Sequence, residues 1–173
     1  MPPSPHLVIH GPSAVAHYLP ARHPLKPGRA DDSIRLLRSA RLVGSDGIDV
    51  RSPTPASDHD LMRVHDAAYI AVADRLSRAP TDPDYLDPSS RDAVAHGFSR
   101  DGDNPPYFQM GDAARHACGG VIEASRHVLD HNGTVAFVPS AGANHHAMRA
   151  RASGFGIFND AAVAIAAIRA TGA

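Results

Sequence analysis

The segment TVAFVPSAGANHHAMRARASGFGIFND, residues 134–160, combines a strand pattern with a pair of adjacent histidines. Its first five residues, Thr134–Val138, are mostly apolar or β-branched and lie between a glycine and a proline, which predicts a strand. The adjacent histidines His145 and His146 follow beyond the carboxyl end of that strand. Because an imidazole can gain or lose a proton near neutral pH, we expect proton-transfer chemistry at this point.

Strand and helix patterns alternate along the rest of the chain. Alternating strands and helices predict an α/β domain with a mainly parallel sheet, in which ligands bind beyond the carboxyl ends of the strands. The segment 79–110 is rich in proline, glycine and aspartate, and so long an irregular connection is usually functional or partly disordered. Apolar spacing predicts strands at 7–10 and 48–50, and helices from Asp31 or Asp32, from 57 through 72, from 112 to 129, and from Asn159 or Asp160 to 170.

Composition limits the classes of function. The 173 residues are 43% hydrophobic and 20% charged, as in one soluble globular domain. The net charge of −1, without a run of like charges, indicates neither nucleic acid nor an anionic membrane as a partner. No segment approaches the roughly 20 apolar residues that cross a bilayer, and the amino terminus does not resemble a secretory signal. A single cysteine, Cys118, fits a reducing, cytoplasmic location.

Three local patterns leave alternatives open. Asp58-His59-Asp60 is compact, but its place in a capping box favours a helix start over a metal site. Gly154 and Phe155 could bring the backbone close to a ligand and add an apolar wall, or could form a simple turn before the last helix. Scattered histidines, such as those at 96 and 131, are interpreted as surface or helix-face residues.

Four segments, in the right order, carry a resemblance to a known family. Residues 145–160 resemble the "HHA…ASGFC…ND" signature of the zinc-dependent histone deacetylase superfamily, and within it the bacterial acetoin utilization proteins. The match covers the chain from about residue 7 to 171. The other matching segments are HPLKPGR at 23–29, VHDAAYI at 64–70, and DNPPYF at 103–108 followed by the glycine pair at 119–120.

The resemblance implies a fold and a reaction. The expected fold is the three-layer arginase/deacetylase-like α/β fold, of which residues 1–173 form the amino-terminal part of a single domain, with the carboxyl-terminal half missing. The expected reaction is hydrolysis of the acetyl-amide of acetylated lysine or another acetylated amine. In this family a zinc ion polarises the carbonyl, a bound water attacks it, and the tandem histidines handle protons.

Residue roles carry over from the family motif position by position. His145 matches the first histidine of the pair, and His146 matches the second, which acts as general base. Gly154 matches the glycine whose carbonyl contacts the substrate amide, and Phe155 matches one aromatic wall of the acyl-lysine tunnel. Asp103 matches the rim aspartate that holds the substrate backbone.

The family's zinc ligands, two aspartates and one histidine, are expected beyond the region that this chain matches. We therefore expect no metal ligands here and a chain that is inactive alone; the alternative is a truncated relic or binding module that holds no zinc. An unpaired sheet edge and uncovered apolar surface favour poor solubility, an oligomer, or pairing with the missing half. The sequence also departs from the family motif at Ala143, Asn144 and Gly156, and we expect Ala143 to crowd the backbone and Gly156 to loosen the pocket wall.

Overall fold

The computed structural model describes residues 6–11, 28–43 and 48–172, so most of the HPLKPGR segment lies outside the described residues. None of the helices in these ranges is long and apolar enough to span a membrane. In chain order the elements are β1 (His6–Ile9), α1 (Arg29–Ser39), β2 (Ile48–Arg51), α2 (Asp58–Leu61), α3 (Ala67–Leu76), α4 (Arg91–Ala95), α5 (Met110–Asp130), β3 (Ala136–Phe137) and α6 (Asp160–Arg169).

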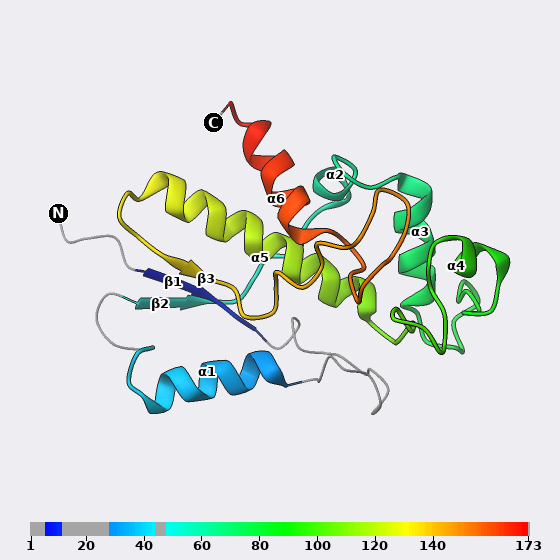
Figure 1. Ribbon diagram of the computed structural model, residues 1–173, viewed down its shortest axis with the longest axis horizontal. Helices are drawn as coiled ribbons and strands as arrows, with labels where there is room; N and C mark the ends of the chain where they lie inside the picture. The colour runs from blue at the N-terminus through cyan, green and yellow to red at the C-terminus, as the bar shows by residue number, and fades with distance from the viewer. Residues whose placement is uncertain (1–5, 12–27, 44–47, 173) are drawn as a thin grey trace.

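The sheet is parallel and lies between two helical layers. Its strand order is β2-β1-β3, with both neighbours parallel to β1. Successive side chains of a strand point to opposite faces: Leu7 and Ile9 pack with Ala124 of α5, whereas Val8 packs with Ile34 of α1. Figure 1 shows the sheet between these two helices. This arrangement confirms the predicted three-layer α/β class.

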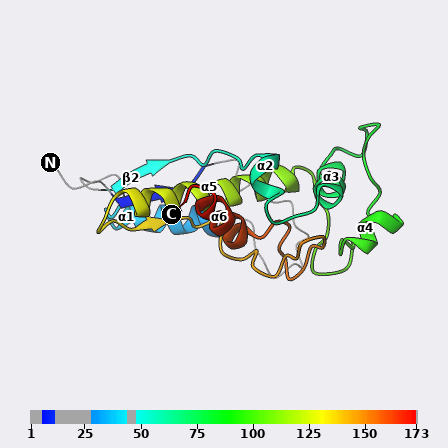
Figure 2. The same cartoon turned by 90° about the horizontal axis from the view of Figure 1, so that it is seen from above.

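Helix α5 connects the sheet to a second, larger core. The backbone of α5 lies directly against Thr54 because Gly119 has no side chain. A Cβ on Gly119 would lie 1.8 Å from the carbonyl oxygen of Thr54. Beyond the sheet, buried side chains of α5 pack with those of α3 and α6, among them Cys118, Tyr69 and Val163. Figure 2 shows α3 and α4 at the end of the molecule away from the strands.

The helix predicted from 57 through 72 is interrupted. The capping box is confirmed, because the Ser57 side chain accepts from the backbone of Asp60, whose carboxylate accepts from the Ser57 backbone. After α2, however, the chain turns, and the Asp66 backbone N–H donates to the carbonyl of Arg149 at 3.1 Å instead of to a helical carbonyl. The prediction of one continuous helix is therefore wrong, because the segment forms two separate helices.

Three other predicted elements differ in extent. Helix α5 begins at Met110, two residues before the prediction, and ends at Asp130, one residue after it. The predicted strand 134–138 is shorter in the structure: β3 lies at one edge of the described sheet and pairs with β1 through two residues. The segment 79–110 contains α4, whose start is capped by the Ser90 side chain.

An exposed apolar groove runs between α5, α6 and β3. Leu129 and Ile165 are 59% and 61% exposed within it. This uncovered surface agrees with the expectation from the sequence and lies beside the edge strand β3. Its other apolar lining residues include Val121, Ala124, Val128, Ala136, Val138 and Ile168.

We predict that this groove drives self-association, since large exposed apolar patches favour contacts between proteins. Leu129→Lys should shift the chain toward the monomer in sedimentation velocity. The control is Leu36→Lys, which changes an exposed leucine on α1 that does not line the groove. A monomeric parent chain, or equal effects of the two substitutions, would contradict the prediction.

Candidate active site

The two adjacent histidines lie together on an exposed loop between β3 and α6. Their ring centroids are 4.3 Å apart, with the ring planes inclined by 39°. The Nδ1 atom of His145 lies 3.1 Å from the carbonyl oxygen of Gly142. Because a carbonyl oxygen only accepts, Nδ1 carries the proton of the neutral ring, which leaves the His145 Nε2 lone pair available.

Gly154 lies against His146. A Cβ built on Gly154 would lie 2.8 Å from the Cβ, Cγ and Cδ2 atoms of that histidine, so no other residue fits without moving the ring. Gly154 also has a left-handed φ of +49°, and the next residue, Phe155, has φ of +71°. Two successive left-handed residues turn the chain sharply and bring the loop back over the histidine pair. This turn contacts His146, and the approach of its backbone to a ligand stays a prediction.

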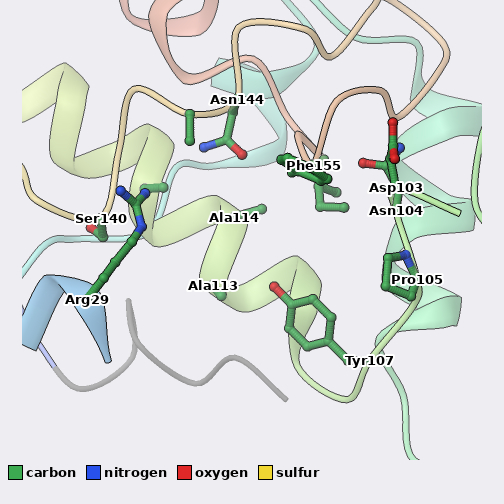
Figure 3. Close-up of a pocket in the computed structure, with 13 residues that line it drawn as sticks. Arg29, Asp103, Asn104, Pro105, Tyr107, Ala113, Ala114, Ser140, Asn144 and Phe155 are labelled. Atoms are coloured by element: carbon green, nitrogen blue, oxygen red, sulfur yellow. The ribbon is translucent and has the colours of Figure 1, made fainter. Parts of the chain in front are cut away.

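Phe155 and Asp103 line one small cavity of about 40 Å³ together with Asn144. In the view of Figure 3, Phe155 lies between Asn144 and Asp103. Ala143 is half-buried and lines the same cavity, whereas neither ring of the histidine pair does. The five predicted site residues therefore form two groups: His145, His146 and Gly154 in one, and Phe155 and Asp103 in the other. The peptide bond between Gly154 and Phe155 connects the two groups.

A buried histidine outside the pair, His65, holds the site loop in place. Its Nδ1 lies 3.0 Å from the carbonyl oxygen of Met148 and 3.3 Å from that of Arg149, and its Nε2 accepts from the backbone N–H of Asn159 at 3.0 Å. These partners require a neutral ring protonated at Nδ1 only. Burial lowers the pKa of His65, although the two carbonyls and the charge of Asp66 oppose that shift.

Two further side chains fix the same loop to the α3–α4 region. The hydroxyl of buried Tyr69 donates to the carbonyl of Ile157 at 2.5 Å, and burial raises the pKa of that hydroxyl. His96 donates from Nδ1 to the carbonyl of Ala150 at 2.7 Å, and its own carbonyl accepts from Ala152 at 2.9 Å. The interpretation of His96 as a surface or helix-face residue is therefore wrong.

The Asn-Asp pair at the start of α6 holds the loop from the other side. Asn159 caps the helix through its side-chain oxygen, as predicted, and its amide lies 3.1 Å from the carbonyls of both His145 and Ala147. Asp160 is fully buried, and one of its oxygens accepts from the backbone N–H of Gly142 at 2.7 Å. The backbone around the histidine pair is consequently fixed at several points.

The described residues do not provide a metal site. Nowhere in the described ranges do three histidine, cysteine, aspartate or glutamate side chains gather in a group that could hold a metal ion. The Asp58-His59-Asp60 cluster serves the helix start: Asp60 completes the capping box, and Asp58 accepts from Arg115 at 2.6 Å. Cys118 is buried, and burial raises the pKa of its thiol, so the neutral thiol belongs to the core.

Reasoning from the sequence did not assign a role to His65, His96 or Asn144. The family-like segment VHDAAYI contains both His65 and Tyr69, so the resemblance pointed to that segment without indicating what its side chains do. Nothing in the local sequence of His96 distinguishes it from an exposed histidine. Its role depends on a contact between residues 54 positions apart.

Known structures share this fold. The chain superposes on an HDAC homolog from Aquifex aeolicus with a TM-score of 0.79 and 26% sequence identity, covering 98% of this chain and 42% of that one. The class of protein is thus the histone deacetylase fold, in line with the expectation from the sequence.

The chain belongs to the histone deacetylase family, because the model of the histone deacetylase domain matches residues 23–173. It is 32% identical over 158 residues to the acetoin utilization protein AcuC of Bacillus subtilis (strain 168), covering 91% of this chain and 38% of that relative. It is 29% identical over 157 residues to histone deacetylase 2 of Oryza sativa subsp. japonica, covering 29% of that relative. The chain thus spans well under half the length of these relatives.

We predict that stability falls on acidification because of His65. Its pKa in the folded state lies below the ordinary value of 6.5, so the folded protein binds fewer protons than the unfolded chain below that pH. The stabilisation is complete above pH 6.5 and is lost as the pH falls toward the lowered folded pKa. His65→Gln, which keeps a donor and an acceptor but cannot titrate, should flatten this part of the pH profile in urea unfolding.

His59→Gln is the control, since this histidine is exposed on α2. It should leave the pH profile of the unfolding free energy unchanged. A profile equally steep in the parent and in His65→Gln would show that the His65 contacts do not require the neutral ring.

We predict that Gly154→Ala lowers the free energy of unfolding by more than the cost of placing an alanine in the left-handed conformation. A left-handed alanine costs about 1–2 kcal/mol, and the collision with His146 adds about 1–3 kcal/mol. Gly133→Ala is the matched control, because Gly133 has φ of +79° and nothing lies within 4 Å of an added Cβ. Equal losses of unfolding free energy in the two variants would contradict the contact between residue 154 and the ring.

Proposed function

We propose that this chain supplies the proton-handling half of a deacetylase active site that hydrolyses acetylated lysine or a related acetylated amine. The observation that carries the proposal is the close packing of His146 on Gly154, beside a His145 ring whose Nδ1 is already engaged. Exposed imidazoles that lie together can exchange protons with a bound substrate.

The residue roles in this proposal follow the family motif. His146 acts as general base, and His145 assists it through the unengaged Nε2. The carbonyl of Gly154 contacts the substrate amide, Phe155 forms an apolar wall for the acyl-lysine chain, and Asp103 holds the substrate backbone at the rim. Support comes from Phe155 and Asp103 lining one cavity, one residue away from the glycine that contacts His146.

The family is generally zinc-dependent, and no three histidine, cysteine, aspartate or glutamate side chains gather among the described residues in a group that could hold that ion. We propose that the ligands belong to polypeptide outside them, either in a longer form of the chain, of which residues 1–173 are the amino-terminal part of a single domain, or in a separate chain. This agrees with the chain covering only 38% of the Bacillus subtilis relative. Residues 1–173 alone are then inactive.

The test measures zinc content and hydrolysis of an acetyl-lysine peptide, with the chain alone and after fusion to the unmatched carboxyl-terminal part of that relative. The chain alone should hold no stoichiometric zinc and show no turnover, whereas the fusion should gain both. His146→Ala in the active fusion should lower kcat by about 10²- to 10⁴-fold, as for other general bases, and keep the zinc.

His59→Ala is the control histidine substitution and should leave turnover unchanged. Stoichiometric zinc and turnover by residues 1–173 alone would refute the claim that the site is incomplete. A well-folded fusion that holds zinc but does not turn over would favour the alternative of a binding module.

A further inference from the structure

Two departures from the family motif, Asn144 and Gly156, contact each other. A Cβ on Gly156 would lie 2.8 Å from the carbonyl oxygen of Asn144 and 2.9 Å from its Cα. Gly156 is buried, so the backbone of Asn144 occupies the space that a side chain at 156 would take. The expectation that Gly156 loosens the pocket wall is therefore wrong: residue 144 fills that space.

The side chain of Asn144 reaches the buried carboxylate of Asp160. Its Nδ2 donates to one carboxylate oxygen at 2.8 Å, and the same oxygen accepts from the Gly142 backbone N–H at 2.7 Å. The other carboxylate oxygen accepts from the backbone N–H of Ala161 at 2.8 Å. Loss of the Asn144 amide would leave a buried charge with one donor fewer, which is costly in the interior.

These contacts lead directly to the histidine pair. Gly142 donates its N–H to Asp160 and accepts from the Nδ1 of His145 with its carbonyl, so the carboxylate and the first ring hold the two peptide groups on either side of the Gly142 Cα. The carbonyl of Asn144 accepts from the Ala147 N–H at 3.0 Å, across the turn that contains both histidines. The position of residue 144 therefore fixes both ends of this turn.

We propose that Asn144 is a positioning residue for His145 and His146, and that it acts only because residue 156 is a glycine. The amide pulls residue 144 onto Asp160, and the bare backbone at 156 allows it to lie there. A side chain at 156 pushes residue 144 away, breaks its bond to Asp160 and reorients the pair. The catalytic meaning of this inference rests on the proposed function, but the structural coupling does not.

The test compares Asn144→Ala, Gly156→Ala and the double variant in the full chain. The first readout is the set of Cε1–H and Cδ2–H chemical shifts of His145 and His146, which report ring position without substrate. Both single variants should shift these signals, and the signals of His131 should stay in place. The second readout is the urea midpoint, which should be non-additive, because the displaced residue 144 in Gly156→Ala has already lost its bond to Asp160.

Gly102→Ala is the control for adding a methyl group, since its Cβ would meet only the exposed Ser99 side chain at 3.2 Å. It should leave the histidine signals unchanged. If Gly156→Ala does not fold, Asn144→Ala alone decides, because it only removes a side chain.

Unchanged signals of His145 and His146 in Asn144→Ala would overturn the positioning role, and additive midpoints would overturn the dependence on Gly156. In the fusion with the relative's carboxyl-terminal part, Asn144→Ala should lower kcat with little change in KM. Shifted histidine signals in a fusion without turnover would count against the proposed function alone, and the coupling would stand.

Discussion

The arrangement of the site depends on one buried imidazole that must stay neutral. His65 donates from Nδ1 toward the carbonyls of Met148 and Arg149 and accepts at Nε2 from the backbone of Asn159. These partners lie on both sides of the turn 153–156, so a single ring closes the loop that carries the histidine pair. A protonated His65 ring would point its Nε2–H at the Asn159 N–H and lose this hydrogen bond. Burial disfavours the charged ring, so the loop geometry depends on His65 staying buried.

His65 is itself held in place by the hydrophobic core that it packs against. His65 and Tyr69 lie within one aromatic cluster with Phe158, with ring centroids 5.5–5.9 Å apart. That cluster rests on the core shared by α3, α5 and α6. On the far side of the loop, Asp160 holds the residues before the pair. The exposed histidines are therefore rigidly supported, as proton transfer in a defined direction requires.

The sequence predicted those features that depend on local pattern. The apolar run at residues 7–9 predicted a strand, and the structure packs that strand between two helices. The capping box at 57–60 and the Asn159-Asp160 pair predicted two helix starts. The family-like motif named His145, His146 and Gly154, and the structure brings the last two into contact. What the sequence did not reveal depends on contacts between distant residues. The break after α2 follows from the hydrogen bond of the Asp66 backbone N–H to the carbonyl of residue 149. The contact between Asn144 and Gly156 follows from the fold of the loop.

Hydrogen exchange of the Asn159 backbone amide reports directly on whether the neutral His65 ring holds the loop. This N–H precedes α6, where an amide without a partner exchanges freely, and here it donates to His65 Nε2. We expect strong protection of this amide at pH 7.5 and a loss of protection on acidification, in step with protonation of the His65 ring followed by NMR. Rapid exchange of this amide at pH 7.5, in a chain whose α5 amides are protected, would contradict this expectation.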